Sequence, residues 1–360
     1  MKIRDRYIAK TLLTYTMVVL LVWLSIYSFF NFLAELNNVG RDGYTILSAF
    51  KYVVLQLPEV AYNQSSPVIL LGCILGMGHL ATTSQLLIFR VSGASILKIT
   101  FITLKNALTF VLIIIIIGEF LAPISNIFAE NSRSIAMGND DISINQEGFW
   151  IRDGDNFINV NKNIDGKLFS GITVIEVNSL NKIERVIKSS TAIFDNNSLD
   201  MRDSEIFSID DSSFFDNLSF KERNSYNKIV SFDQDLIGSL EKKPKDLRTW
   251  TLIKQIQFLS DNKLSSGVFE VELYKRLVRP LTLIAMILIA MLFIFGSTRD
   301  VTLGRKIFFG VAVGLSFELL SRIGAALALS FGFNPLFSSV LPSTIVIIIS
   351  IIFLFKKSIS

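Results

Sequence analysis

Few side chains in this sequence have the types and spacing that chemistry requires. His79 is the only histidine and Cys73 the only cysteine, and both lie in an apolar segment, so the sequence offers no ligand set for zinc. The adjacent aspartates at 140–141 and 210–211 lie in polar, turn-like segments, which favours solvated surface over an acid–base pair. The phosphate-binding pattern G-x-x-x-x-G-K-[ST] does not occur. We therefore predict that the chain is not an enzyme and has no cofactor of its own.

Glu119, Glu318 and Arg322 are ionisable residues at predicted membrane depth. A charge at membrane depth is costly, so each of them should face a partner or a wet cavity. Glu318 and Arg322 are four residues apart and can pair on one helix face. The sequence leaves open whether they only pair with each other or also contact a substrate.

The composition indicates a membrane protein, because 51% of the residues are hydrophobic and 30 are Phe. Six apolar stretches approach the roughly 20 residues that cross a bilayer. They are 12–33, 65–81, 99–122, 278–296, 307–329 and 338–355. The apolar segment before the second stretch contains Pro58 and predicts an approach helix. Six spans in two groups of three are therefore expected.

Basic residues gather at the chain ends and in two of the connections between spans. The clusters are Lys2, Arg4, Arg6 and Lys10; Arg90 and Lys98; Arg299, Arg305 and Lys306; and Lys356 and Lys357. With six spans all four clusters fall on one face, which the positive-inside rule makes cytoplasmic. Both termini are then cytoplasmic and segment 126–270 is on the outer side. Because these cations lie at span ends, a nucleic-acid partner is not expected.

Segment 126–270 differs chemically from the rest of the chain. It has 17 Lys and Arg against 23 Asp and Glu, whereas the remainder has 18 against 8. Runs such as "NFINVNKN" and "SGITVIEVNS" alternate β-forming residues between turn-rich separators, which predicts an antiparallel β-sandwich or open roll. The expected fold is an α-helical membrane protein with spans in 1–125 and 271–360 and an inserted β-domain at 126–270.

The connection "ATTSQLLIFRVSGAS" carries an apolar run on the cytoplasmic side, where such a run usually marks a partner surface. Thr82 or Thr83 can cap a helix and Gly93 can stop it, which predicts about three turns over roughly 82–93. The apolar side chains would then cover a broad face. The alternative is that the run merely extends the second span.

Several segments together resemble one known family, the lipopolysaccharide export permeases LptF/LptG, and its LptG branch in particular. They are "RDRYIAKTLL", "FLAELNNVGRDGY", "SSPVILLGCILGMGHLATTSQLLIFRVSGAS", "IGEFLAPISNIFAENSRSIAM" and "QEGFWIRDGDNFINV". Their order and spacing are specific, and the resemblance covers the whole chain. It implies that the β-domain is a periplasmic β-jellyroll and that the chain is a permease subunit of an ABC transporter in the bacterial inner membrane.

The resemblance also implies partners. These are a related permease (LptF-like), a cytoplasmic ATPase dimer (LptB-like) that binds ATP and Mg, a single-span LptC-like protein, a periplasmic LptA-like bridge toward the outer membrane, and lipopolysaccharide itself.

The resemblance implies roles for particular residues as well. The expected ATPase-coupling residues are Gln85, Leu86, Leu87, Phe89 and Arg90. The expected lipid or headgroup contacts are Phe29, Phe32, Arg41, Arg133, Leu315 and Leu319.

This chain departs from the family pattern at two places. It has Asn31, Asn37 and Asn38 where many members carry lysines, and Gln85 where a glutamate is common. Two other functions remain open: a permease of another ABC system, such as lipoprotein release or efflux, and a membrane receptor or scaffold. The first typically has four spans with its insert after the first span.

Overall fold

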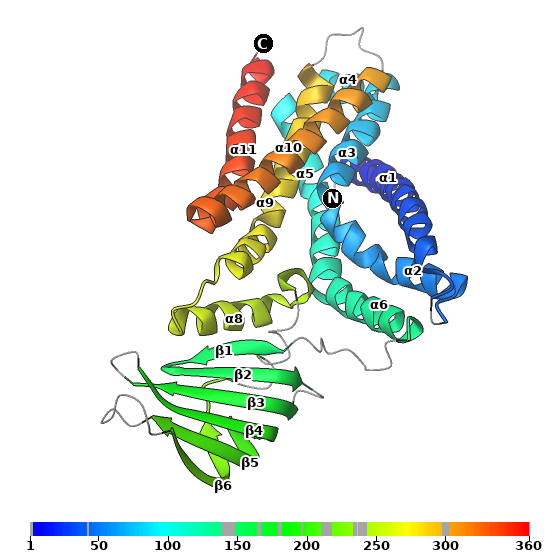
Figure 1. The fold of residues 1–360 in the computed structure, drawn as a ribbon. Coiled ribbons are helices and arrows are strands. Elements are labelled where there is room, and N and C mark those ends of the chain that lie inside the picture. Colours follow the sequence, from blue (N-terminus) through cyan, green and yellow to red (C-terminus); the bar gives the residue numbers. More distant parts are fainter. Residues whose placement is uncertain are drawn as a thin grey trace. The chain divides into compact units, whose positions relative to one another are not determined.

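The computed structural model describes residues 3–41, 43–138, 148–163, 167–178, 182–195, 197–209, 218–232, 236, 243–296 and 303–359. The chain forms two compact units. The first comprises Met1–Met137 with Glu270–Ser360, and the second comprises Gly138–Phe269 (Figure 1).

The first unit is helical. Its helices are α1 (Ile3–Glu35), α2 (Ile46–Asn63), α3 (Ser65–Thr82), α4 (Gln85–Val91), α5 (Ile96–Ile116), α6 (Ala122–Ala136), α9 (Gly267–Gly296), α10 (Leu303–Phe331) and α11 (Pro335–Ile359). Within the described residues, six helical segments are long and apolar enough to cross a membrane: α1, α3, α5 continued through α6, α9, α10 and α11. The prediction of six spans in two groups of three is confirmed.

The approach helix before the second span is α2. Thr45 caps it, because its hydroxyl accepts a hydrogen bond from the backbone N–H of Ser48 at 3.2 Å. Pro58 lies inside α2, and Gln64 separates α2 from α3. α2 therefore leads directly into the second span, as the sequence indicated.

α3 is the central helix of this unit. In an apolar 18-residue stretch of α3, 78% of the residues are buried. The corresponding fractions are 6% for α1 and 17% for α10. Gly72 lets α1 approach closely, since a Cβ there would lie 2.5 Å from Oγ1 of Thr16 and 2.6 Å from its Cα. Gly310 of α10 packs against Ile74 of α3. Because positions 72 and 74 lie about 200° apart on a helix, α1 and α10 occupy opposite sides of α3.

A π-helical turn, η2 (Ile117–Leu121), joins α5 to α6 without a break. It contains Gly118, where a Cβ would lie 2.1 Å from the ring of Tyr62, so only glycine fits against α2 here. A π turn interrupts the regular hydrogen-bond ladder and changes a helix's direction. Figure 1 shows α6 leaving the direction of α5. α6 then packs along α2, where Ser125 Oγ donates to the Leu55 carbonyl at 2.6 Å.

The described residues of the second unit form a six-stranded antiparallel sheet in the order β1-β2-β3-β4-β5-β6. Its strands are β1 (Phe149–Asp153), β2 (Asn156–Asn163), β3 (Leu168–Val177), β4 (Ile183–Asp195), β5 (Ser198–Ile209) and β6 (Leu218–Ile229). Alternate residues are buried along β2, as in the pairs Ile158 and Val160, so one face forms the core. The expected inserted antiparallel β-domain is confirmed.

The sheet curls, so that its last strand lies across from its second and third. Side chains of β6 reach Asn156 of β2 and Glu176 of β3, although neither strand is its neighbour in the sheet. Of the two folds that the sequence allowed, the described strands form the roll. Helix α8 (Thr249–Asp261) closes on the same core, where Phe258 lies edge-on to Phe232 at 6.1 Å between ring centroids.

Candidate functional site

The predicted coupling helix is α4, which has seven residues and therefore two turns instead of three. Ser84 precedes it with a left-handed φ of 59°, so the backbone changes direction between α3 and α4. Gly93, the predicted stop, follows with φ +84°. The apolar run is thus a separate helix and does not extend the second span.

The threonines before α4 do not cap it. The hydroxyls of Thr82 and Thr83 both donate to the His79 carbonyl, at 3.0 and 2.8 Å, and thereby satisfy the end of α3. Ser84 occupies the N-cap position without a side-chain hydrogen bond. The capping prediction was wrong because a threonine can bond back to the preceding turn as readily as forward to the next.

α4 has two distinct apolar faces. Leu86 is buried in the core of the helical unit, and Phe89 packs against that core. Leu87, Ile88 and Val91 are 56%, 63% and 82% exposed. Sequence spacing predicted one broad face and did not single out Ile88, because only the docking of α4 on the bundle decides which side faces outward.

The two polar residues of α4 differ in their surroundings. Arg90 is exposed at the end of the helix. Gln85 is half-buried, and its side-chain oxygen accepts no hydrogen bond from the described residues.

At the other end of the bundle Arg133 of α6 pairs with Glu35 at the end of α1, at 2.5 Å between Nε and Oε1. The carboxylate side chain is only 7% exposed and the guanidinium side chain 32%. The guanidinium also lies over the ring of Tyr52 at 5.1 Å, and the Tyr52 hydroxyl donates to Glu130 at 3.1 Å. This cluster joins α1, α2 and α6.

The other polar residues near this end differ in exposure. Asn31 donates to Gln56 at 2.7 Å, and Asn38 donates to Glu35 at 2.9 Å. Asn37 and Arg41 are exposed. Of the two predicted headgroup contacts, Arg41 presents its charge outward, whereas Arg133 is already paired within the chain.

The four predicted apolar lipid contacts lie on two helices. Phe29 of α1 is exposed, whereas Phe32 packs edge-on against Phe50 of α2 at 6.4 Å between ring centroids. Leu315 and Leu319 are exposed on α10. Since α1 and α10 pack on opposite sides of α3, the chain alone does not bring the two pairs together.

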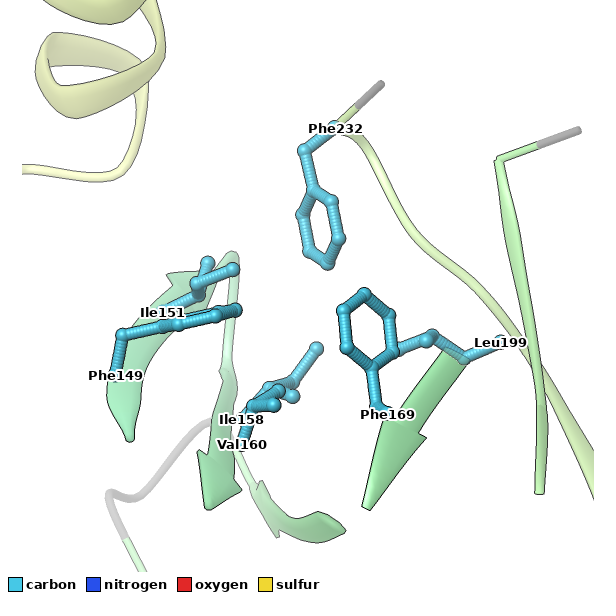
Figure 2. Close-up of a pocket in the computed structure, with 7 residues that line it drawn as sticks. All are labelled: Phe149, Ile151, Ile158, Val160, Phe169, Leu199 and Phe232. Carbon is cyan, nitrogen blue, oxygen red and sulfur yellow. The ribbon is translucent and has the colours of Figure 1, made fainter. Parts of the chain in front are cut away.

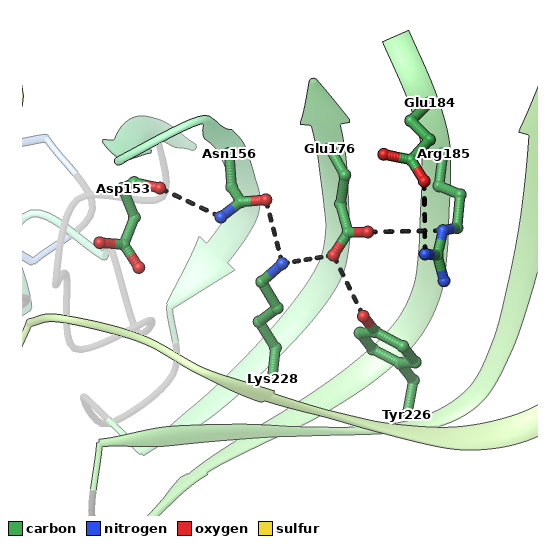
Figure 3. A network of polar contacts seen from close by, with 7 residues as sticks. All are labelled: Asp153, Asn156, Glu176, Glu184, Arg185, Tyr226 and Lys228. Carbon is green, nitrogen blue, oxygen red and sulfur yellow. Dashed lines mark hydrogen bonds and ion pairs between the residues drawn. The ribbon is translucent and has the colours of Figure 1, made fainter. Parts of the chain in front are cut away.

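The β-domain contains a polar network that the sequence did not indicate (Figure 3). Lys228 of β6 pairs with the Glu176 carboxylate of β3 and donates to Asn156 of β2 at 3.0 Å. The Tyr226 hydroxyl donates to Glu176 at 3.1 Å, and Arg185 lies 3.6 Å from the same carboxylate. These side chains lie on the inner face, beside the apolar core, and link the two layers of the roll.

A second contact joins the end of β6 to β1. Ser231, just after β6, donates its backbone N–H to Asp153 of β1 at 3.1 Å and its hydroxyl to the same carboxylate. The end of the last strand is therefore held to the end of the first.

The network shifts the titration of its members. Burial by itself raises the pKa of Glu176, but the hydrogen bonds from Lys228 and Tyr226 and the charges of Lys228 and Arg185 outweigh it and lower the pKa below its ordinary value. Burial, together with the Glu176 charge, raises the pKa of Tyr226. The carboxylate is therefore ionised at neutral pH.

A small apolar pocket lies inside the roll (Figure 2). Figure 2 shows seven hydrophobic side chains converging on it, from β1, β2, β3, β5 and the segment after β6: Phe149, Ile151, Ile158, Val160, Phe169, Leu199 and Phe232. Phe149 and Phe169 meet edge-on at 6.5 Å between ring centroids. The space between these side chains is too small for a water molecule, so they form the packed apolar core of the roll.

His79 and Cys73, the two candidates for metal binding in the sequence, are packed against other side chains of the helical unit. His79 packs beside the ring of Tyr15 at 5.5 Å between ring centroids, and Cys73 is buried in α3. The part of the chain that the structure describes contains no group of three or more His, Cys, Asp or Glu residues arranged to hold a metal. The aspartates at 140–141 and at 210–211 lie outside the described residues.

Comparison with known proteins gives consistent matches along the chain. The family model for the lipopolysaccharide export system permease LptF/LptG matches residues 6–357. The lipopolysaccharide export system permease protein LptG of Escherichia coli (strain K12) is 29% identical over 357 residues, which cover 98% of both chains. The protein of the same description from Haemophilus influenzae is 26% identical over 345 residues, 96% of each chain.

Proposed function

The chain belongs to the LptF/LptG family of lipopolysaccharide export permeases, and from this we propose how its surfaces serve lipopolysaccharide export. As a member it is a multi-pass permease subunit of the inner membrane. We place both termini and α4 in the cytoplasm and the β-domain in the periplasm, because the basic clusters gather at one end of the spans. Two members of these clusters, Lys2 and Arg299, lie outside the described residues.

The cytoplasmic partner is a separate ATPase dimer that binds ATP and Mg and docks on α4. The exposed face of α4, formed by Leu87, Ile88 and Val91, is the observation that supports this. An apolar face on a short helix at the water side fits a groove on a partner. Leu86 and Phe89 act differently, because they anchor α4 to the bundle and so transmit displacement of the ATPase to the spans.

The two polar residues of α4 complete the docking surface. Arg90 supplies an ionic contact at its edge, and Gln85 contributes no charge, so docking depends on shape more than on a salt bridge.

A triple alanine variant of the outward residues Leu87, Ile88 and Val91 tests this docking. The ATPase should no longer co-purify with the permease, while the permease itself should still insert and fold, since exposed side chains contribute little to stability. Leu47→Ala is the matched control, because Leu47 is 75% exposed on α2, at the other end of the bundle. Wild-type recovery of the ATPase with the triple variant would remove α4 from the docking surface.

A second, related permease completes the membrane part of the transporter. It contacts the exposed sides of α1 and α10 of this chain, because these two helices are little buried within the chain itself. Phe29, Leu315 and Leu319 then lie near the lipid cavity, and Phe32 lies behind them against α2. Since the exposed sides of α1 and α10 do not meet within one chain, the cavity needs the second subunit.

On the periplasmic side Arg41 and Arg133 are the proposed headgroup contacts. Arg41 is exposed and available, whereas Arg133 must share its guanidinium with Glu35 or exchange that partner for a phosphate. The β-domain then receives the acyl chains on its apolar inner face and passes the lipid to an LptA-like bridge. A single-span LptC-like protein joins the complex at this step.

A further inference from the structure

α10 carries an ion pair on its exposed side, within the span. Nε of Arg322 lies 3.4 Å from Oε1 of Glu318. The arginine side chain is 70% exposed and the glutamate side chain 25%, so the cation is the outward group. A guanidinium has five N–H donors, and in the described residues Arg322 uses one of them, so the others are available to a ligand.

The pair lies deep in the membrane. The span Ile307–Phe331 is about 37 Å long at 1.5 Å per residue, and Arg322 is about 14 Å from its Phe331 end. Side chains on a helix tilt toward its N-terminus, which directs Arg322 toward Glu318 and away from the nearer membrane boundary. Snorkelling therefore cannot bring the guanidinium to that boundary, and bulk hydrocarbon is a poor neighbour for this face.

The same face also carries apolar side chains. Positions 315, 319, 322 and 326 lie within about 60° of one another around the helix, at 100° per residue. Leu315 and Leu319 are exposed on this stripe beside Arg322, and so is Ala326. A surface that combines exposed leucines with one hydrogen-bond donor cluster is complementary to an amphiphile.

We propose that this stripe contacts the transported lipid, with Arg322 donating hydrogen bonds to oxygen atoms of the lipid and Glu318 holding the guanidinium in position. The inference rests on the proposed role of α10 in lining the lipid cavity. Depth selects the oxygens: phosphates belong near the membrane boundary, whereas the carbonyl and hydroxyl oxygens of the acyl linkages extend further inward. Neutral acceptors also leave the pair without net charge in a medium of low dielectric.

A photo-crosslinking side chain at Ala326 tests which molecule covers the stripe, in the intact transporter with native lipid. Lipopolysaccharide should be captured there, and not from Leu320, which is 59% exposed and lies about 160° away from Arg322 and about 120° away from Ala326 around the helix. Capture of bulk phospholipid from position 326 would make the stripe an ordinary lipid-facing surface, and capture of a protein would make it a subunit contact. Either result overturns the proposal.

A double variant separates lipid contact from folding. E318Q/R322Q leaves no charge at this depth, so it should insert as well as the wild type. Capture of lipopolysaccharide from Ala326 should nevertheless fall about tenfold, as expected when a charge-assisted hydrogen bond is lost. Unchanged capture would overturn the role of Arg322. If depletion of the chain still stops lipopolysaccharide from reaching the outer membrane, the export function stands and only the Arg322 contact fails.

Discussion

Replacing Lys228 with methionine should loosen the β-roll by an amount that the network allows to be estimated. Methionine keeps most of the side-chain length but leaves Glu176, which is 14% exposed, without its main partner. Removing one partner of a buried ion pair costs about 3–5 kcal/mol. The Tyr226 hydroxyl remains and offsets about 1 kcal/mol. Arg185 is 45% exposed and offsets about 0–1 kcal/mol more. The expected loss is therefore about 1–4 kcal/mol.

The pH dependence of this loss of stability follows from the pKa of Glu176 in the wild type and in the variant. In the wild type the pKa of Glu176 is lowered, so the carboxylate's contribution to stability is present above its ordinary pKa and is lost as pH falls through the lowered value. Without Lys228, burial should raise the pKa of Glu176 instead. The deficit of the variant should then be largest near neutral pH and should shrink as the pH falls through that raised pKa.

Hydrogen exchange on the intact chain can measure the effect, because it reports the opening free energy of each strand. Amides in β2, β3 and β6 should exchange faster in Lys228→Met. Lys188→Met is the control, since Lys188 is exposed on β4 outside the network. Equal protection of these strands in both variants at neutral pH would refute the view that Lys228 holds the two layers of the roll together.

Two further predictions concern the helical unit. Gly72→Ala should lower the stability of the purified permease by about 1–3 kcal/mol, because the new Cβ would overlap the α1 backbone. Gly304→Ala is the control and should have little effect, because a Cβ at position 304 would have no atom within 4 Å. Equal melting temperatures of the two variants would contradict the close contact between α1 and α3. Arg133→Ala should destabilise the chain by about 2–3 kcal/mol even without lipid, since the buried Glu35 carboxylate loses its cation and keeps the hydrogen bond from Asn38. Arg41→Ala should change stability by less than about 0.5 kcal/mol. Equal unfolding midpoints for the two variants would show that the Glu35 pair contributes nothing.

Hydropathy was sufficient to predict the six spans, because the bilayer requires about 20 predominantly apolar residues of each spanning helix. The approach helix could also be identified, since Pro58 and Pro67 break the regularity of the long apolar run. In the structure Pro58 lies inside α2, and Gln64 separates α2 from α3. The faces of α4 could not be derived. Leu86 and Leu87 are neighbours of the same type, and only contact with the bundle makes one of them buried and the other exposed.

The β-domain shows a different limit. Its buried strands have alternating apolar residues, which local sequence reveals. β5 and β6 are too polar for alternation of apolar residues to identify them as strands. The runs "RDSE" in β5 and "KERN" in β6 resemble loop sequences. The pairing of Lys228 with Glu176 depends on how far the sheet curls. That curl arises from contacts between strands, so spacing along the chain does not encode it.

The central position of α3 has an evolutionary consequence. A change of volume in α3 must be absorbed by α1 on one side and by α10 on the other, so most substitutions there need two compensating changes. Substitutions on the outward faces of α1 and α10 are limited instead by the lipid and the subunit that these faces contact. Among relatives, α3 should therefore diverge slowest of the six spans, and its rare substitutions should occur together with changes at positions such as Thr16 and Gly310.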